Sequence, residues 1–198
     1  MADPIDVIMP AYNAERWIAD AVRSVLALDA VRSLTIADDG SANPLTPALA
    51  GSDDPRLTIL RRPNGGEAAA RNTAIERLLA AADPADDAAS WVMFFDSDDL
   101  LLPGCVDALA DAARAGAVAC VASRESFWPD GRLEPLDPPE DLRDRCFASP
   151  DDAFRYQQVY ASTGMTVRRS VLRAGERWAE RIHTCPAIEL LHRFAKHG

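Results

Sequence analysis

The chain has 198 residues, of which 48% are hydrophobic and 26% charged, so it is long and apolar enough to bury the core of one domain. Its net charge of −10 argues against nucleic acid or an anionic membrane as the main partner, because both would repel it. The first residues lack the basic and apolar regions of a signal peptide, and no apolar run is long enough for a transmembrane helix, so we expect a cytoplasmic protein.

Short apolar runs alternate with helical patterns along the first part of the chain. The runs predicted to form strands cover residues 7–9, 34–37, 57–60 and 91–95. Helical patterns cover 17–26, 67–82 and 103–115, with Asn13 as the expected N-cap of the first, a short helix before residue 50 and a polar linker at 83–90. Strands that alternate with helices predict a parallel α/β sheet, in which the loops after the strands meet at one edge.

The rest of the chain has a less regular pattern. We expect a strand at 118–122, a hairpin at 127–133 around an Asp-Gly turn, and little regular structure in the proline-rich stretch 135–150. The remaining predictions are a helix at 152–160, a loop or short strand at 162–165, a helical turn at 170–172 and an amphipathic helix at 188–194. The four cysteines lack a Cys-x-x-Cys pair, which favours free thiols over a zinc site.

The apolar run at 91–95 leads directly into the acidic segment DSDD at 96–99. Three carboxylates at the end of a buried strand repel one another unless protons or a cation reduce their charge. Mg²⁺ or Mn²⁺ would do so, because these cations prefer oxygen ligands and take some from carboxylates and others from substrate phosphates. Considered alone, the segment is explained better as a solvated acidic loop that caps the next helix, since Asp-x-Asp is common.

Four short motifs occur in order, each at an expected strand end or turn. They are PAYN at 10–13, DDGS at 38–41, NGG at 64–66 followed by ARN at 70–72, and DSDD at 96–99. Together they resemble the family 2 glycosyltransferases of the GT-A fold, over residues 5 to about 116 and again near 168–172 and 189–198. The resemblance implies a single GT-A domain over 1–198, a Rossmann-like three-layer α/β/α sandwich with a mainly parallel sheet. Its nucleotide-sugar-binding half would be 1–118 and its acceptor-side half 119–198.

The same resemblance implies a set of donor-binding residues. These are Pro10, Ala11, Tyr12, Asp38, Asp39, Arg71, Asp96, Ser97 and Asp98. Asp39 would accept a hydrogen bond from the ring N–H of a uracil-like base, and Arg71 would lie near the base or the diphosphate. Simpler explanations stay open: turn chemistry for Asp38 and Asp39, an i,i+4 ion pair with Glu67 for Arg71, and packing for Tyr12.

The implied reaction moves a sugar from a nucleoside-diphosphate sugar, with UDP favoured, to an acceptor hydroxyl with inversion. Asp98 and Asp99 would be catalytic, and Asp96, Asp98 and Asp99 would be ligands of Mn²⁺ or Mg²⁺, which stabilises the leaving diphosphate. The acceptor would be a glycan, a lipid-linked molecule or a protein. The resemblance also suggests bacterial polysaccharide biosynthesis, and a peripheral position at the inner membrane stays open.

The sequence departs from the family where the general base is expected. A Glu-Asp pair commonly begins the last helix, and this chain has Pro186 and Ala187 there, neither of which can take a proton. Glu189 is a weak candidate for the base, and Glu180 and His183 are weaker. A relative that binds nucleotide sugars without turnover therefore stays an alternative. A nucleotidyltransferase ranks last, because the segment 10–13 has neither glycine nor lysine.

Overall fold

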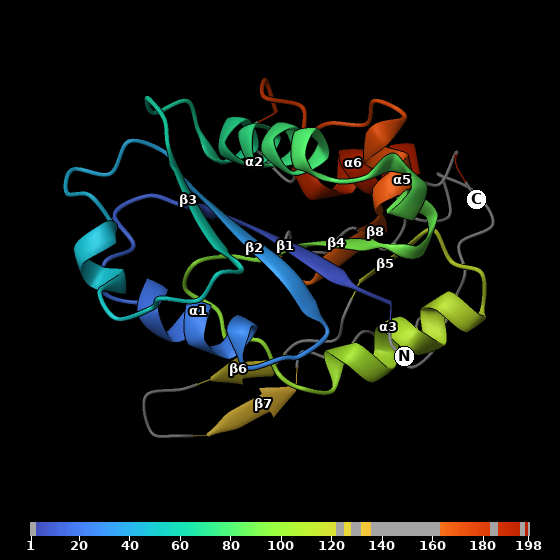
Figure 1. Cartoon of the computed structure of the whole chain (residues 1–198), viewed down its shortest axis with the longest axis horizontal. Coiled ribbons are helices and arrows are strands. Elements are labelled where there is room, and N and C mark those ends of the chain that lie inside the picture. Colours follow the sequence, from blue (N-terminus) through green and yellow to red (C-terminus); the bar gives the residue numbers. More distant parts are fainter. Residues whose placement is uncertain are drawn as a thin grey trace.

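A six-stranded sheet in the order β3-β2-β1-β4-β8-β5 runs through the centre of the molecule (Figure 1). This computed structural model describes residues 3–121, 125–127, 132–135, 163–182, 186–194 and 197. The strands of the sheet are β1 (Ile5–Ala11), β2 (Val31–Asp38), β3 (Leu57–Arg61), β4 (Trp91–Phe94), β5 (Ala119–Val121) and β8 (Met165–Arg168). Strands β3, β2, β1 and β4 are parallel, whereas β8 is antiparallel to both of its neighbours, so the sheet is mainly parallel as expected.

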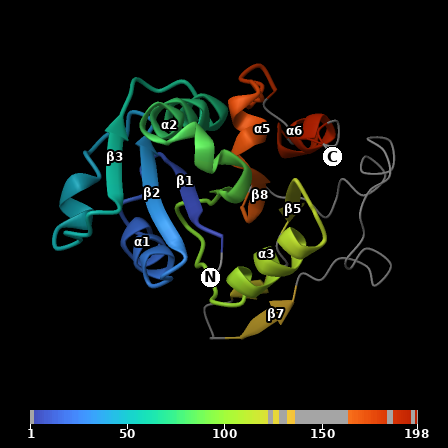
Figure 2. The same ribbon diagram turned by 45° about the vertical axis from the view of Figure 1, so that its right-hand side comes forward.

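Helices cover both faces of this sheet and make three layers (Figures 1 and 2). One face carries α1 (Ile18–Leu26) and α3 (Cys105–Arg114). The other carries α2 (Glu67–Ala81), α5 (Arg169–Arg173) and α6 (Pro186–Phe194). Two 3₁₀-helices, η1 (Thr46–Leu49) and η2 (Pro84–Ala89), complete the connections. In the described ranges, no helix combines the length and the apolar character that a membrane span requires.

The sequence of β1 shows why the sheet is covered on both faces. All seven of its residues are buried, and successive side chains point to opposite faces. Ile5, Val7 and Met9 pack in the core cluster of α1, whereas Ile8 packs in the cluster of α2. The alanine-rich sequence of α2 lets that helix lie close to the strands, with Ala70 and Ala74 fully buried.

Most elements predicted from the sequence are confirmed, and two details are wrong. The expected polar linker at 83–90 contains η2, which Asp83 caps by accepting a hydrogen bond from the backbone N–H of Ala85 at 2.9 Å. Asn13 does not cap α1, because Trp17 occupies the N-cap position without a side-chain bond.

The predicted hairpin is present as β6 (Glu125–Phe127) paired with β7 (Leu133–Pro135), and its turn lies outside the described residues. The predictions for 136–160 lie outside them as well. Cys105 and Cys120 are free thiols, as expected. Burial raises the pKa of both, that of Cys120 to about 12, which disfavours their thiolate forms.

A buried ionic network ties together β1, β2, η2 and α5. The Arg169 guanidinium donates to Asp6 at 3.0 Å and to Asp87 at 2.5 Å, and all three side chains are almost fully buried. Arg32 donates to Asp6 at 3.0 Å, and Arg173 donates to Asp87 at 2.6 Å. The C-terminal segment is thus held to the first strand by paired charges that the local sequence pattern does not predict.

Candidate functional site

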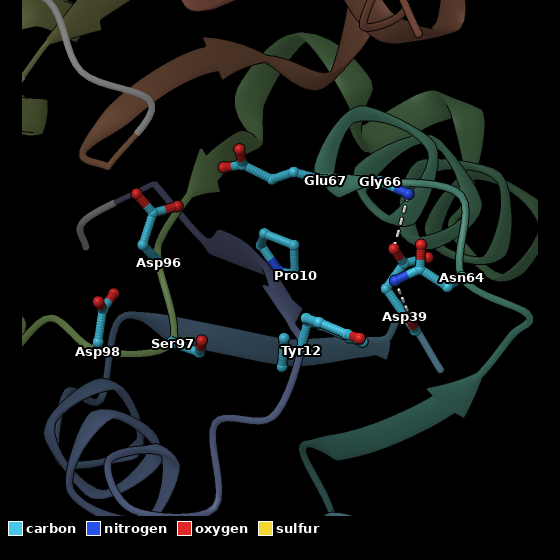
Figure 3. Close-up of a pocket in the computed structure, with 10 residues that line it drawn as sticks. Pro10, Tyr12, Asp39, Asn64, Gly66, Glu67, Asp96, Ser97 and Asp98 are labelled. Carbon is cyan, nitrogen blue, oxygen red and sulfur yellow. Dashed lines mark hydrogen bonds between the residues drawn. The ribbon is translucent and has the colours of Figure 1, made fainter. Parts of the chain in front are cut away.

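An open cleft of about 380 Å³ lies at the carboxyl ends of the parallel strands (Figure 3). Its lining comes from the end of β1, the loops that follow β1, β2, β3 and β4, and the start of α2, because parallel strands bring these segments to one edge of the sheet. The lining residues are Pro10, Ala11, Tyr12, Asp39, Asn64, Gly66, Glu67, Asp96, Ser97 and Asp98. The expectation that separate motifs converge on one site is therefore confirmed for the side chains at 39 and 98.

Not every residue expected to bind the donor lines the cleft. Seven of the predicted donor-binding residues do so: Pro10, Ala11, Tyr12, Asp39, Asp96, Ser97 and Asp98. Asp38 and Arg71 are buried behind the cleft wall, and Asp99 is not among the lining residues either. Asp38 and Asp39 are adjacent in the sequence, but only Asp39 lines the cleft, because the two side chains point in different directions from the end of β2.

Asp39 is held rigidly at the cleft wall. Its carboxylate accepts hydrogen bonds from the backbone N–H groups of Gly65 at 3.1 Å and Gly66 at 2.7 Å, and it forms an ion pair with Arg62. The bond to Gly66 is drawn in Figure 3. The Gly65 N–H is shared with the second carboxylate oxygen at 3.2 Å, so the three donors on Arg62, Gly65 and Gly66 hold both oxygens of Asp39.

Asp38 has a structural role in the turn after β2. Its carboxylate accepts from the backbone N–H of Ser41 at 2.9 Å and from the Arg61 guanidinium at 3.0 Å. Asn13 fastens the same turn to the end of β1, donating its backbone N–H to Ser41 Oγ at 2.9 Å. The turn chemistry considered from the sequence accounts for Asp38.

Gly40 allows this turn to approach the loop after β3. Its φ is +77°, and a Cβ atom there would lie 2.8 Å from the backbone nitrogen of Asn64. We expect Gly40→Ala to lower the free energy of unfolding by about 2–4 kcal/mol, measured by urea denaturation. Gly51→Ala is the matched control, because Gly51 has φ +91° and no atom within 4 Å of the added Cβ. Equal losses in both variants would show that the close approach contributes nothing.

The loop after β4 is held from two sides. The backbone N–H of Asp96 donates to Thr163 Oγ1 at 2.8 Å. The Asp96 carboxylate accepts a hydrogen bond from the Arg71 guanidinium at 2.6 Å. Arg71, which is 0% exposed, also forms an ion pair with Glu67 one helical turn earlier. The i,i+4 ion pair with Glu67 that the sequence suggested is therefore confirmed, whereas Arg71 does not line the cleft and its role in donor binding stays a prediction.

The cleft is acidic. Four carboxylates line it and no lysine or arginine does, within the part of the chain that the structure describes. Arg62 pairs with Asp39, and Arg71 is shared by Asp96 and Glu67. Asp98 is exposed, and no hydrogen bond or ion pair joins its carboxylate to a described residue. Two arginines thus face the four lining carboxylates among the described residues, which leaves the cleft with net negative charge in that part of the chain.

The three aspartates of the segment 96–99 do not form a ready-made metal site. The described residues contain no group of three or more His, Cys, Asp or Glu side chains placed to hold a metal ion. The assignment of Asp96, Asp98 and Asp99 as metal ligands therefore stays a prediction. The carboxylates present suit Mg²⁺ or Mn²⁺, which often take one or two protein carboxylates and complete their coordination with water and substrate phosphates.

Three lining residues were not assigned from the sequence: Asn64, Gly66 and Glu67. The first two belong to a recognised motif, and Glu67 was considered only as a partner of Arg71. Their position immediately after β3, at the same edge as the other motifs, is the signal that could have identified them.

None of the candidate bases among the described residues lines the cleft. Glu189 pairs with Arg193 at 2.7 Å on α6, and Glu180 accepts a hydrogen bond from Asn72 at 2.9 Å. Ala187 is buried near the start of α6, and His183 lies outside the described residues. These contacts occupy both glutamates away from the cleft.

Comparison with known proteins is consistent with this geometry. The succinoglycan biosynthesis protein ExoW of Rhizobium meliloti (strain 1021) is 38% identical over 105 residues, which are 50% of this chain and 30% of that protein. The chain spans less than a third of each curated relative to which it was matched.

Solved structures share the fold of the chain. The structure of S. aureus TarS 1–349 has a TM-score of 0.70 at 18% identity, over 97% of this chain and 55% of that one. The mannosyltransferase PcManGT from Pyrobaculum calidifontis has a TM-score of 0.67 at 17% identity, over 100% of this chain and 55% of that one. These likenesses confirm the GT-A fold class expected from the motifs. Because the family model "Glycosyl transferase family 2" matches residues 6–175, well over half of the sequence, the chain belongs to that family.

Proposed function

We propose that the cleft binds a nucleoside-diphosphate sugar, with UDP as the favoured nucleotide, and that its sugar passes with inversion to an acceptor hydroxyl. The observation that carries this proposal is the acidic cleft itself, with four carboxylates and no basic side chain among its described lining residues. A diphosphate is an anion, so it binds at such a site only if a divalent cation reduces the repulsion. The proposed reaction is therefore metal dependent.

The proposed placement of the donor follows the charges along the cleft. Asp39, fixed by Gly65 and Gly66, would accept the ring N–H of the base, with Tyr12 beside it. Asp98 and either Asp96 or Asp99 would hold the cation. Bound Mn²⁺ or Mg²⁺ would supply Lewis-acid stabilisation to the leaving diphosphate.

The comparisons support the ligand class without deciding the nucleotide. TarS 1–349 has been solved with UDP and with UDP-GlcNAc, and PcManGT with GDP-Man and Mn²⁺. The name of ExoW, a succinoglycan biosynthesis protein, supports polysaccharide assembly as the process we propose. We leave the acceptor at the level of a hydroxyl on a glycan, a lipid-linked molecule or a protein.

A second candidate function is nucleotide-sugar binding without turnover. The observation that favours it is the absence of a carboxylate at the start of α6, where Pro186 and Ala187 stand, together with the pairing of Glu180 and Glu189 elsewhere. An inverting transfer needs a group that takes the proton of the acceptor hydroxyl. Metal-dependent hydrolysis of a UDP-sugar, even if slow, would argue for the transferase.

The proposed function is tested by thermal unfolding with UDP and Mn²⁺. At a ligand concentration of about 100 times Kd, binding should stabilise the chain by about 2.7 kcal/mol, or roughly 5–10 °C in Tm. UDP with EDTA, and Mn²⁺ without nucleotide, should give much smaller shifts because the cation and the diphosphate complete one site. GDP and ADP identify the preferred base. The absence of a shift with every nucleoside diphosphate would contradict the proposal.

A further inference from the structure

Trp178 lies behind the cleft wall, in the segment between α5 and α6. It is 2% exposed, and its backbone is fastened to α2 by Asn72 in both directions. The backbone N–H of Trp178 donates to Asn72 Oδ1 at 2.9 Å, and Asn72 Nδ2 donates back to the backbone carbonyl of Trp178 at 3.0 Å. Asn72 Nδ2 also donates to Glu180 in the same segment. One side chain of α2 therefore holds a segment that follows more than 100 residues later.

The Trp178 ring packs against Arg71. The guanidinium carbon lies 4.3 Å from the ring centroid, and Phe94 of β4 contacts the ring edge-on, with the centroids 5.0 Å apart. Arg71 Nε and Nη1 are buried and have no hydrogen-bond partner among the described residues, and Nη2 makes the ion pairs with Asp96 and Glu67. Among the aromatic side chains, tryptophan attracts a cation to its ring face most strongly. This attraction is larger at a buried site from which water is excluded. The ring thus replaces the hydrogen bonds that the two other nitrogens lack.

This arrangement forms a chain of contacts from the C-terminal segment to the cleft. Asn72 fixes the segment, Trp178 fixes the guanidinium, and Arg71 fixes the Asp96 carboxylate at 2.6 Å. Because only one nitrogen of Arg71 makes the ion pairs, a small movement of the guanidinium would break both of them. The Asp96 carboxylate would then lose its ion pair with Arg71, and the repulsion among the lining carboxylates would increase.

We infer that Trp178 is a positioning residue for the donor site, which couples docking of the segment 174–182 to nucleotide binding by holding Arg71 against Asp96. The inference rests on the proposed function, because the ligand whose binding it controls is the nucleoside diphosphate. Trp178 itself does not line the cleft. Its effect on the ligand therefore passes through Arg71 and Asp96.

The chain contains a matched control for the loss of a buried tryptophan. Trp91 is 0% exposed, stands at the other end of β4, and has the Arg168 guanidinium 3.7 Å from its ring centroid. Its indole nitrogen is buried and has no partner in the part of the chain that the structure describes, and the same holds for the indole nitrogen of Trp178. The two sites share burial and an arginine over the ring, and only Trp178 is connected to the cleft.

The test compares Trp178→Leu with Trp91→Leu. The first measurement is the Kd of UDP in Mn²⁺ by calorimetry, well below the unfolding temperature. We expect Trp178→Leu to bind about tenfold more weakly and Trp91→Leu to stay within about twofold of the unaltered chain, although both lose stability. Trp178→Phe, which keeps an aromatic face, should recover much of the loss. Equal affinity in Trp178→Leu and the unaltered chain would overturn the inference.

A second measurement tests the positioning role of Trp178 independently of nucleotide binding. Hydrogen exchange of the Asp96 backbone amide, which is bonded to Thr163, needs no nucleotide. It should be faster in Trp178→Leu and unchanged in Trp91→Leu. If the unaltered chain binds no nucleotide, the proposed function fails. Independently of that result, an unchanged rate of Asp96 amide exchange in Trp178→Leu would overturn the positioning role. If Trp178→Leu does not fold, Asn72→Ala takes its place. It should weaken UDP binding about threefold and speed the same exchange, and no change in either would overturn the inference.

Discussion

Replacing Asp98 with asparagine is expected to lower metal-dependent turnover of a UDP-sugar by about 10²–10³-fold. Asp98 lines the cleft and makes no hydrogen bond or ion pair with a described residue, so its charge is available for a cation. The amide of asparagine lacks the negative charge that attracts Mn²⁺. Without the bound cation, the diphosphate is repelled by the remaining carboxylates of the cleft. Release of UDP from the sugar donor, followed at saturating Mn²⁺, measures the effect.

The control for this change is Asp111→Asn. Asp111 is an exposed aspartate on α3 that pairs with Arg114 at the helix surface and is not among the lining residues. Its replacement should leave turnover and stability nearly unchanged, because exposed ion pairs contribute about 0–1 kcal/mol. If Asp98→Asn retained turnover within about twofold of the unaltered chain, Asp98 would not be a ligand of the catalytic cation.

The largest loss of stability is expected at Arg169. Arg169→Met should lower the free energy of unfolding by about 3–5 kcal/mol, because it leaves the buried carboxylates of Asp6 and Asp87 with fewer partners. Urea denaturation measures the change. Arg23→Met is the matched control, because the pair of Arg23 with Asp20 is exposed on α1 and its loss should cost less than about 1 kcal/mol. A small loss at Arg169 would mean that the network is not a stabilising element.

The pH dependence of this loss identifies its cause. Burial acts to raise the pKa of Asp87, but hydrogen bonds from Arg173 and Arg169 outweigh it, so the pKa of the folded state lies below the usual value. Such a carboxylate stabilises the fold above its unfolded pKa of about 3.9 and loses this contribution as the pH falls through the folded pKa. The difference between Arg169→Met and the unaltered chain should therefore shrink below about pH 4. A difference that is constant with pH would assign the loss to packing.

Local patterns in the sequence predict the strands and helices of the first half and the sheet edge at which their polar loops meet. The apolar runs of β1, β2, β3 and β4 and the helical period of α2 are local features, so each element can be predicted from its own residues. In a parallel sheet the carboxyl ends of the strands lie at one edge, which places Tyr12, Asp39 and Asp98 on one cleft without further information.

Packing between distant segments distinguishes the roles of residues that are neighbours in the sequence. Asp38 and Asp39 are adjacent and chemically identical, yet Arg61 and the turn hold the first, whereas only the second lines the cleft. Trp178 pairs with Asn72 across 106 positions, and Arg169 pairs with Asp6 across 163. Contacts of this kind have no local period or spacing, because they arise only when the packed sheet brings distant segments together, and so no pattern in the sequence could predict them.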